Sequence, residues 1–353
     1  MREAVRRFTF VGAAVSLLVV AGMASGAAAS PAAPAADPAA LSGHGVSNDA
    51  AGIAAIDEFW TDERIRSAKP VPLPVRSSPR DGQRASVLSA QSGEGSAPDG
   101  GSGDTGSSLA AVEQAQRWNR QGSNPARTFG RILFSTANGG TGACSGSIIT
   151  AGNSNTVWTA GHCIHPGGTG AGNYYQNFIF IPDNDNGAEP WGRWYYKWAN
   201  TTVGWQDDQD YDLDIAAIAF WPSGQRGNLQ TTLGSQGYRF GFGEDFANVH
   251  EFGYPADGYN RTDFTGLNLW YCQGEVEGES IFNDTMEAQC DMGRGASGGP
   301  WVEDLQTSRG WGYIIGSSSH RDGDENGNFI NNSLYAAESG DGAINVYNDV
   351  SVR

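Results

Sequence analysis

The most informative segment of this sequence is GRGASGGP, at residues 293–300. Glycines on both sides of Ser297 let the backbone turn so that several N–H groups point to one place, which is how an anion-stabilising hole is built. The N–H groups of Gly295 and Ser297 are the expected donors. A serine hydroxyl at the centre of such a turn is a candidate nucleophile.

Two upstream segments supply the groups that a serine nucleophile needs. TAGHC (159–163) contains His162, and DLDIAA (212–217) contains two aspartates. An imidazole takes the serine proton, and a buried carboxylate holds that imidazole in the right tautomer. We expect Ser297 as nucleophile, His162 as general base and Asp214 as the orienting acid. Asp212 stays an alternative, because it lies two residues earlier on the same face of an extended segment.

The order His, Asp, Ser resembles the chymotrypsin-like serine endopeptidases, and within them the secreted bacterial branch that includes the glutamyl endopeptidases. The resemblance covers roughly residues 125–350, and further segments that carry it are CSGS (144–147), FGYP (252–255) and CDMGRGASGGP (290–300). It implies a serine endopeptidase with peptide or protein substrates. One departure is Ala296, where animal members carry an acid that pairs with the N-terminus freed at activation.

An all-β fold is expected from short β-type runs and 50 glycines, a pattern typical of barrels or sandwiches. The resemblance implies two six-stranded Greek-key barrels, about 125–230 and 231–350, with the active site in the cleft between them. His162 and Asp214 would lie on the first barrel and Ser297 on the second. The expected strands are 131–135, 147–151, 156–159, 177–181, 193–199, 214–220, 251–254, 267–276, 286–291, 299–302, 313–319 and 333–336.

The N-terminal third predicts export and a removable prosegment. Residues 1–30 combine a basic start, an apolar run and small residues, as secretory signal peptides do. Residues 31–110 read as a mostly unstructured prosegment ending in a Gly/Ser-rich linker, with one amphipathic helix over 54–68. We expect a secreted zymogen that is cleaved somewhere within 92–127, where the backbone is accessible.

Charge and hydropathy restrict the partners. The net charge of −17 argues against nucleic acid. No stretch after the leader approaches the length of a membrane span. We therefore expect a soluble, extracellular monomer.

Four cysteines fit an oxidising compartment. Pairing Cys144 with Cys163 would hold the histidine loop against the preceding strand. Cys272 and Cys290 would then close a second loop before the nucleophile. The Cys-x₂-Cys spacing of a zinc site is missing, so we expect two disulfides and no metal there.

The residues that select the substrate are less defined. Asp291 lies six residues before Ser297, at the place of the acid that makes trypsin select Arg and Lys, but the glutamyl-specific branch also carries Cys-Asp there. Ser318, Ser319 and His320 lie on a strand that should line the cleft. Arginines such as Arg321 could instead attract an acidic side chain.

Two acidic loops, 183–187 and 322–328, begin like calcium-binding loops. The second lacks a glutamate at its twelfth position and flanking helices, so solvated turns are the preferred interpretation of both. No cofactor is expected. Two rival functions remain: a non-catalytic homologue that acts as a binding module, and a serine esterase, which would need Gly-x-Ser-x-Gly and the order Ser, acid, His.

Overall fold

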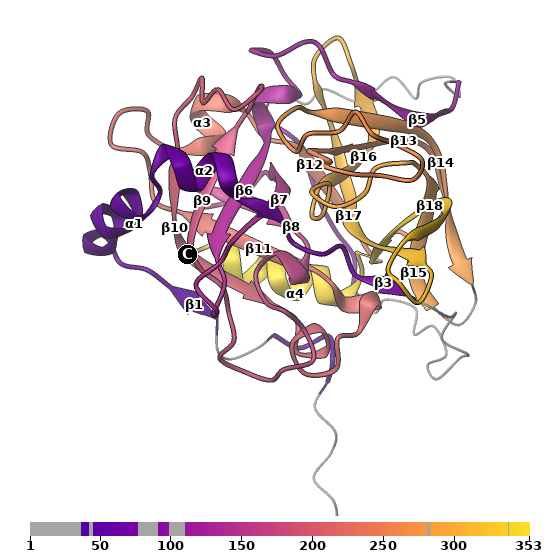
Figure 1. The fold of residues 1–353 in the computed structure, drawn as a ribbon, viewed down its shortest axis with the longest axis horizontal. Coiled ribbons are helices and arrows are strands. Elements are labelled where there is room, and N and C mark those ends of the chain that lie inside the picture. Colours follow the sequence, from indigo (N-terminus) through magenta and orange to yellow (C-terminus); the bar gives the residue numbers. More distant parts are fainter. Residues whose placement is uncertain (1–36, 42–44, 77–90, 99–109, 281–282, 338) are drawn as a thin grey trace, which may run out of the picture. The chain divides into compact units, whose positions relative to one another are not determined.

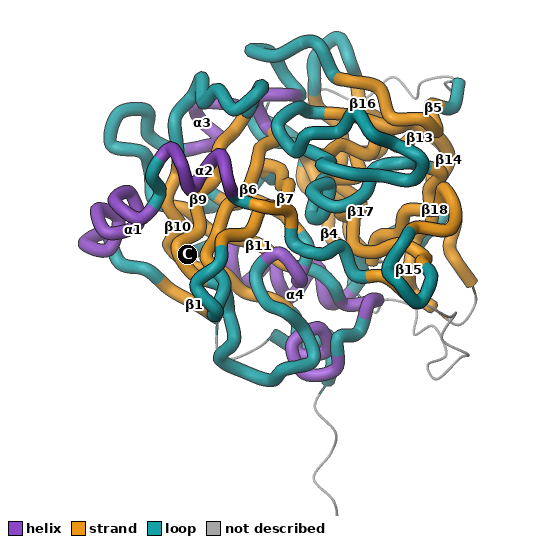
Figure 2. Tube along the Cα trace, in the orientation of Figure 1, coloured by secondary structure: helices purple, strands orange, loops and turns teal. Residues whose placement is uncertain are grey.

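The computed structural model describes residues 37–41, 45–76, 91–98, 110–280, 283–337 and 339–353. These residues form the expected all-β fold of two closed six-stranded antiparallel barrels (Figures 1 and 2). The expected signal peptide, 1–30, lies outside them. Within these ranges, no helix has both the length and the apolar character needed to cross a membrane.

The first barrel closes through six strands in the order β10-β11-β8-β7-β6-β9, with β9 pairing back onto β10. Residues such as Ile132, Phe180 and Ile218 fill its interior because alternate side chains of a strand point to the same face. The strands are β6 (Phe129–Ser135), β7 (Thr141–Ile148), β8 (Thr156–Thr159), β9 (Gln176–Pro182), β10 (Trp194–Thr201) and β11 (Ala216–Phe220).

The second barrel follows the order β16-β13-β14-β15-β18-β17 and closes by pairing of β16 with β17. Val249, Trp301 and Ile315 belong to its buried core. Its strands are β13 (Phe246–Gly253), β14 (Trp270–Ser280), β15 (Asn283–Gln289), β16 (Pro300–Gln306), β17 (Trp311–Gly323) and β18 (Phe329–Ala337). A short strand, β12 (Gly237–Phe240), pairs with β17 outside the closed barrel.

The helical part of the expected prosegment packs against the first barrel. Ile56, Trp60 and Ile65 are buried in that barrel's core cluster. The expected helix over 54–68 is divided into α1 (Ile53–Phe59) and α2 (Asp62–Ser67), because Thr61 caps the second helix by accepting from the Arg64 N–H at 3.3 Å. The short strands of this region and the linker are β1 (Val46–Ser47), β2 (Lys69–Pro70), β3 (Val75–Arg76), β4 (Gly93–Gly95) and β5 (Val112–Arg117).

A C-terminal helix, α4 (Asp341–Val350), joins the end of the second barrel back to the first. Ile344, Val346 and Val350 share a buried cluster with Ala217 of β11 and other first-barrel residues. The sequence analysis did not predict this helix. The remaining helical segments are η1 (Ala50–Gly52), η2 (Ala126–Thr128), η3 (Gly161–Cys163), the π-helical η4 (Gly204–Asp208), η5 (Tyr211–Leu213) and α3 (Leu229–Leu233).

Candidate active site

Ser297 lies in the turn before β16, and two glycines fix its position. Gly295 and Gly298 have φ values of +100° and +72°, which favour glycine. A Cβ on Gly298 would lie 2.0 Å from Thr159 Oγ1, so only glycine lets this turn approach β8. The Ser145 N–H of β7 donates to the Ser297 carbonyl at 2.7 Å. The turn from the second barrel is therefore held directly against the first.

The expected oxyanion donors occupy the same turn. The Ser145 hydroxyl donates to the Gly295 carbonyl at 2.8 Å and accepts from the Tyr254 N–H at 2.9 Å, which holds this peptide in place. Among the described residues, the N–H groups of Gly295 and Ser297 have no backbone acceptor.

His162 sits in η3, directly after β8, and Asp214 lies beside it. The Asp214 carboxylate is fully buried and accepts from the His162 N–H at 2.7 Å and from Nδ1 at 2.8 Å. The Ser319 hydroxyl of β17 donates to the same carboxylate at 2.6 Å. Because an ionised carboxylate only accepts hydrogen bonds, the Nδ1 nitrogen carries the ring proton and Nε2 is the basic nitrogen.

Asp212 takes a different place. Its N–H donates to Asp210 Oδ1 at 3.3 Å, and its side chain is partly exposed in η5. The segment before Ala216 is a 3₁₀ turn and not an extended strand, so residues two apart do not share a face. Of the two aspartates, the structure brings Asp214 to His162.

Ser297 and His162 are both buried, with 0% and 4% of their surfaces exposed. Ser297 Oγ and His162 Nε2 have no hydrogen-bond partner among the described residues, so the structure does not join them directly. Catalytic hydrogen bonds are often long without substrate.

Both expected disulfides are present. Cys144 of β7 is bonded to Cys163 of η3, next to His162. Cys272 of β14 is bonded to Cys290 after β15. The first bond ties the histidine turn to β7, the strand whose Ser145 N–H also donates to the Ser297 carbonyl.

The expected substrate-binding residues of β17 are buried. Ser318 Oγ accepts from Trp301 Nε1 at 3.1 Å, whereas Ser319 bonds to Asp214. The His320 ring packs against Tyr335 at a centroid distance of 4.9 Å and against Tyr211 at 4.5 Å. The pairing of Ser319 with Asp214 was missed in the sequence analysis, because no local pattern connects residues 105 positions apart.

Asp291 and Arg321 each have defined partners. One Asp291 oxygen accepts from the Ala115 N–H at 2.8 Å, and the other from Arg261 Nη1 at 2.7 Å. The Arg321 guanidinium is buried and donates to the carbonyls of Cys290 and Met292, both at 2.6 Å. Burial lowers the Arg321 pKa to about 10, although the charges of Asp291, Asp257 and Asp322 oppose the shift.

The two acidic loops are held by their own hydrogen bonds. The Asp324 carboxylate accepts from the Asn326 and Asn328 N–H groups, both at 2.9 Å. Asp183 Oδ2 accepts from the Gly122 N–H at 2.7 Å and from Trp191 Nε1 at 3.2 Å. These contacts fit the interpretation of the loops as turns.

Residues 69–76, here called the crossing segment, pass from one barrel to the other beside the site. Its first part, β2, pairs in parallel with Gly142 and Ala143 of β7. Its last part, β3, pairs in parallel with Arg321 and Asp322 of β17. Figure 1 shows this part of the chain, in indigo, running from α2 across β7 to β3.

Two side chains anchor the crossing segment. Leu73 has 1% of its surface exposed and belongs to the core cluster of the second barrel. Arg76 forms an ion pair with Glu279 and packs over the Tyr335 ring at 5.0 Å. The Arg321 N–H also donates to the Pro74 carbonyl at 3.2 Å. The segment thus pairs with the two strands that also hold the Ser297 turn, β7 through Ser145 and β17 through Ser318.

This contact was not predicted, because residues 31–110 were expected to be mostly unstructured outside the helix over 54–68. The available signal was PVPLPV at 70–75. Alternating prolines keep a chain extended and leave its carbonyls free to accept.

Comparisons with known proteins agree with this geometry. The chain is 30% identical to the protease Anisep from Arthrobacter nicotinovorans, covering 66% of this chain and 99% of that one with a TM-score of 0.56. It is 28% identical to the thermostable serine protease AL20 from an extremophilic microorganism, covering 64% and 98% with a TM-score of 0.56. A Glu endopeptidase shares the fold at 17% identity and a TM-score of 0.52, covering 68% and 97%. No family model matches the sequence, and a comparison with curated proteins gave no match.

Proposed function

Because the chain belongs to the chymotrypsin-fold serine proteases, we propose that it is a serine endopeptidase that acts through Ser297, His162 and Asp214. The observation that carries the proposal is the Asp214 carboxylate, which is buried and bonded to both the N–H and the Nδ1 of His162. This contact leaves Nε2 as the basic nitrogen of the ring. The nearby Ser297 hydroxyl, in a glycine-rich turn, is the group it would activate.

The proposed reaction has two halves. His162 Nε2 takes the proton of Ser297 Oγ as the oxygen attacks the peptide carbonyl carbon. The resulting oxyanion accepts hydrogen bonds from the N–H groups of Gly295 and Ser297. His162 then gives the proton to the leaving amine, and the carbon–nitrogen bond breaks. Water, activated by the same imidazole, hydrolyses the acyl-enzyme and restores Ser297.

The test compares Ser297→Ala with the unchanged chain on a mixed peptide library. We expect the variant to keep the melting curve and lose hydrolysis by a factor of about 10⁴ or more. Fluorophosphonate labelling at Ser297 separates a competent serine from a dead one, because only an activated hydroxyl reacts. A chain that is not labelled and cleaves no peptide would instead support the binding-module alternative.

The site also bears on substrate preference. Both Asp291 oxygens are engaged by Ala115 and Arg261, which supports a structural role for Asp291 rather than recognition of Arg or Lys. A peptide-library cleavage profile tests the structural role of Asp291, and a dominant preference for Arg or Lys before the scissile bond would contradict it. Ser319 does not select the substrate in this proposal, because it acts by positioning Asp214.

Secretion as a zymogen is the second part of the proposal. The pattern of residues 1–30, the two disulfides and the crossing segment support it together. Ser297 and His162 are both buried in this form of the chain, and in this proposal residues 69–76 are what keeps substrate from them. Cleavage in the linker alone is not enough, so the segment must also leave the site.

The zymogen proposal is tested with the full chain carrying Leu73→Asp, which places a charge at a buried position. We expect this proform to cleave a small peptide faster than the unchanged proform. Ala54→Asp adds the same charge at an exposed position and should have no effect. A peptide of residues 66–76 should inhibit the processed enzyme. N-terminal sequencing of the extracellular protein locates the cleavage site of the prosegment. Equal activity of all the proforms would show that the crossing segment does not block the site.

A further inference from the structure

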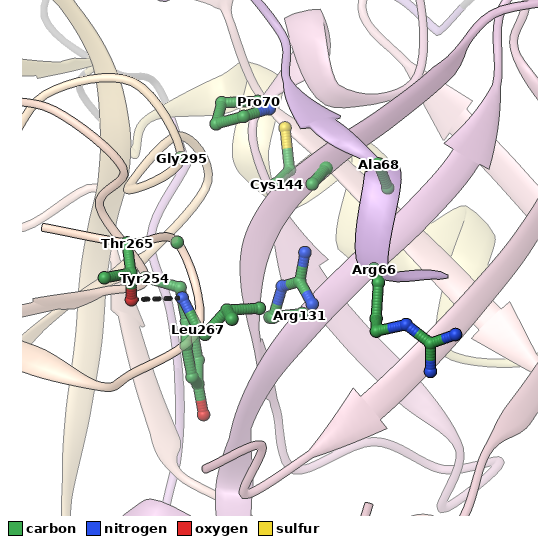
Figure 3. A pocket seen from close by; sticks show the side chains of 11 residues that line it. Arg66, Ala68, Pro70, Arg131, Cys144, Tyr254, Thr265, Leu267 and Gly295 are labelled. Carbon is green, nitrogen blue, oxygen red and sulfur yellow. Dashed lines mark hydrogen bonds between the residues drawn. The ribbon is translucent and has the colours of Figure 1, made fainter. Parts of the chain in front are cut away.

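A small cavity lies beside the Ser297 turn, between the barrels and the crossing segment (Figure 3). Its volume is about 60 Å³. A buried water needs roughly 10–15 Å³ of such space, so the cavity has room for a group of a few atoms, such as a carboxylate. On the barrel side it is lined by Arg131, Ala143, Cys144, Tyr254, Leu267 and Gly295, and on the other side by Arg66, Ala68 and Pro70.

Arg131 is the charged group at the wall of this cavity. It lies on β6, has only 3% of its surface exposed, and its Nη1 has no hydrogen-bond partner among the described residues. Glu189, the carboxylate whose charge acts on Arg131, is itself bonded to Arg193 at 2.7 Å. Figure 3 shows the guanidinium directed toward the side on which Cys144 and Pro70 lie. The described lining residues include two arginines and no acid.

An arginine that is buried and unpaired is costly, because desolvation disfavours its charge. The same burial lowers the Arg131 pKa to about 10, which still leaves it cationic at neutral pH. A guanidinium presents donors in a fixed fork that matches a carboxylate. The missing partner in this cavity is therefore an anion with oxygen acceptors.

The orientation of the His162 ring indicates on which side of the scissile bond the cavity lies. Its Nδ1 faces Asp214, which is also bonded to Ser319 of β17. Nε2 is on the opposite edge of the ring and so faces away from β17. The leaving amine must lie where Nε2 can protonate it, and the Cys144–Cys163 bond holds the turn of His162 against β7. The cavity borders Ala143 and Cys144 of β7, and it therefore receives side chains that follow the scissile bond.

We infer that Arg131 selects substrates with a glutamate or aspartate shortly after the scissile bond. This inference rests on the proposed protease function and assigns a preference on the leaving-group side of the same site. In the proform, residues 66–70 close the cavity without supplying a carboxylate. When they leave, the substrate chain takes their place beside β7 and its acid pairs with Arg131.

The test uses internally quenched peptides that share one sequence before the scissile bond. They carry Glu, Gln or Lys at the first, second or third position after it. At one of these positions we expect the processed enzyme to show at least about a tenfold higher kcat/KM for Glu than for Gln, the factor typical of a charge-assisted hydrogen bond. Lys should be the poorest.

The matched variants are Arg131→Met and Arg226→Met. Met has a length similar to that of Arg without its charge, and Arg226 is an exposed arginine of the same barrel. Arg131→Met should reduce the Glu/Gln ratio to about one while Gln peptides are still cleaved. Arg226→Met should keep the ratio. Arg131→Lys, which retains the charge, should keep part of it and guards against a variant that folds poorly.

A binding measurement separates this inference from the proposed function. The processed chain carrying Ser297→Ala is titrated with the Glu and Gln peptides. Tighter binding of the Glu peptide, lost with Arg131→Met, supports the subsite even if no peptide is ever hydrolysed. Equal Kd values and equal rates for Glu and Gln at all three positions overturn the inference while leaving the protease proposal intact.

Discussion

Asp214 accepts hydrogen bonds from two residues, and Ser319 is the one that does not belong to the proposed triad. Removing its hydroxyl takes away a hydrogen bond to a charged group, typically worth about 1.5–3 kcal/mol. We expect Ser319→Ala to lower kcat about tenfold with little change in KM, because Asp214 then holds His162 less firmly.

Ser318→Ala is the neighbouring control for that prediction. Its hydroxyl accepts from Trp301 and does not contact the carboxylate. It should cost stability rather than kcat, and Ser319→Thr, which keeps a hydroxyl, should recover part of the rate. A Ser319→Ala enzyme with unchanged kcat would show that Asp214 needs no support from β17.

Glu251 makes stability depend on pH. It is fully buried in the second barrel, neither carboxylate oxygen has a partner among the described residues, and desolvation raises its pKa to about 8. The folded chain therefore keeps a proton that the unfolded chain releases above its ordinary pKa. Stability from this group is present at low pH and falls as pH rises towards 8, by about 1.4 kcal/mol per pH unit.

Denaturant unfolding at several pH values checks this prediction. The neighbouring His250 has its pKa lowered to about 4 by burial, so its contribution rises from pH 4 to 6.5 and then stays constant. Between pH 6.5 and 8, of these two groups only Glu251 contributes to the slope. Glu251→Gln should remove the decline there, and an unchanged slope in the variant would contradict the raised pKa.

Residue motifs were predictable where the chemistry is local. GRGASGGP and TAGHC place Ser297 and His162 in turns from sequence alone, and the structure has both in such turns. The choice between Asp212 and Asp214 needed coordinates, because the spacing argument assumed a strand where the chain forms η5. Arg131 carried no signal, since a lone arginine in a β-type run is usually exposed.

The two disulfides provide a comparison between elements of nearly equal loop length, 19 and 18 residues. Replacing either pair by alanine should cost about 3 kcal/mol in the chain-entropy model. Only the Cys144–Cys163 bond ties the histidine turn to β7. We expect its removal to lower kcat well beyond the loss caused by removing Cys272–Cys290.

Unfolding midpoints and kcat on one peptide, measured for both double variants, test this difference. The two losses in stability serve as internal controls for each other. Equal losses in kcat would mean that the turn around His162 is held by its hydrogen bonds to Asp214 and not by the disulfide.

Most strands could be placed from apolar runs, and β8 at Thr156–Thr159 matches its expected bounds. The strand expected at 147–151 begins earlier, at Thr141, because the small residues before Cys144 pair with β6 on one side. Their own pattern is too polar to predict a buried strand. The break between α1 and α2 depends on the cap at Thr61, which the apolar periodicity over 54–68 obscured.

At the scale of the molecule, α4 connects the two barrels, because it follows the second barrel in the sequence and packs against the first. Tyr347 donates to the Thr150 carbonyl at 2.9 Å, and Asp349 accepts from Trp198 Nε1 at 2.8 Å. Both partners belong to the first barrel, although α4 follows the last strand of the second. From the sequence, this segment was assigned to the second barrel without a helix, because nothing in its residue pattern specifies a partner in the first barrel.

Deleting residues 341–353 should destabilise the whole chain by about 5 kcal/mol or more. The deletion removes the buried side chains of Ile344, Val346 and Val350, and the burial of each contributes about 1.5–3 kcal/mol to the free energy of unfolding. Thermal melting and a red shift of the Trp198 fluorescence measure the effect. Deleting only Val352 and Arg353, which are exposed, is the control. A 341–353 deletion that melts like the full chain would show that α4 is dispensable.

The place of α4 also links the folding of the two barrels. The helix follows the last strand of the second barrel, and its buried side chains pack on the first. The first barrel therefore exposes an apolar surface until the chain through Val350 has been synthesised and the helix has docked. A polypeptide cut off between the two barrels should thus be unable to complete the barrel that contains His162.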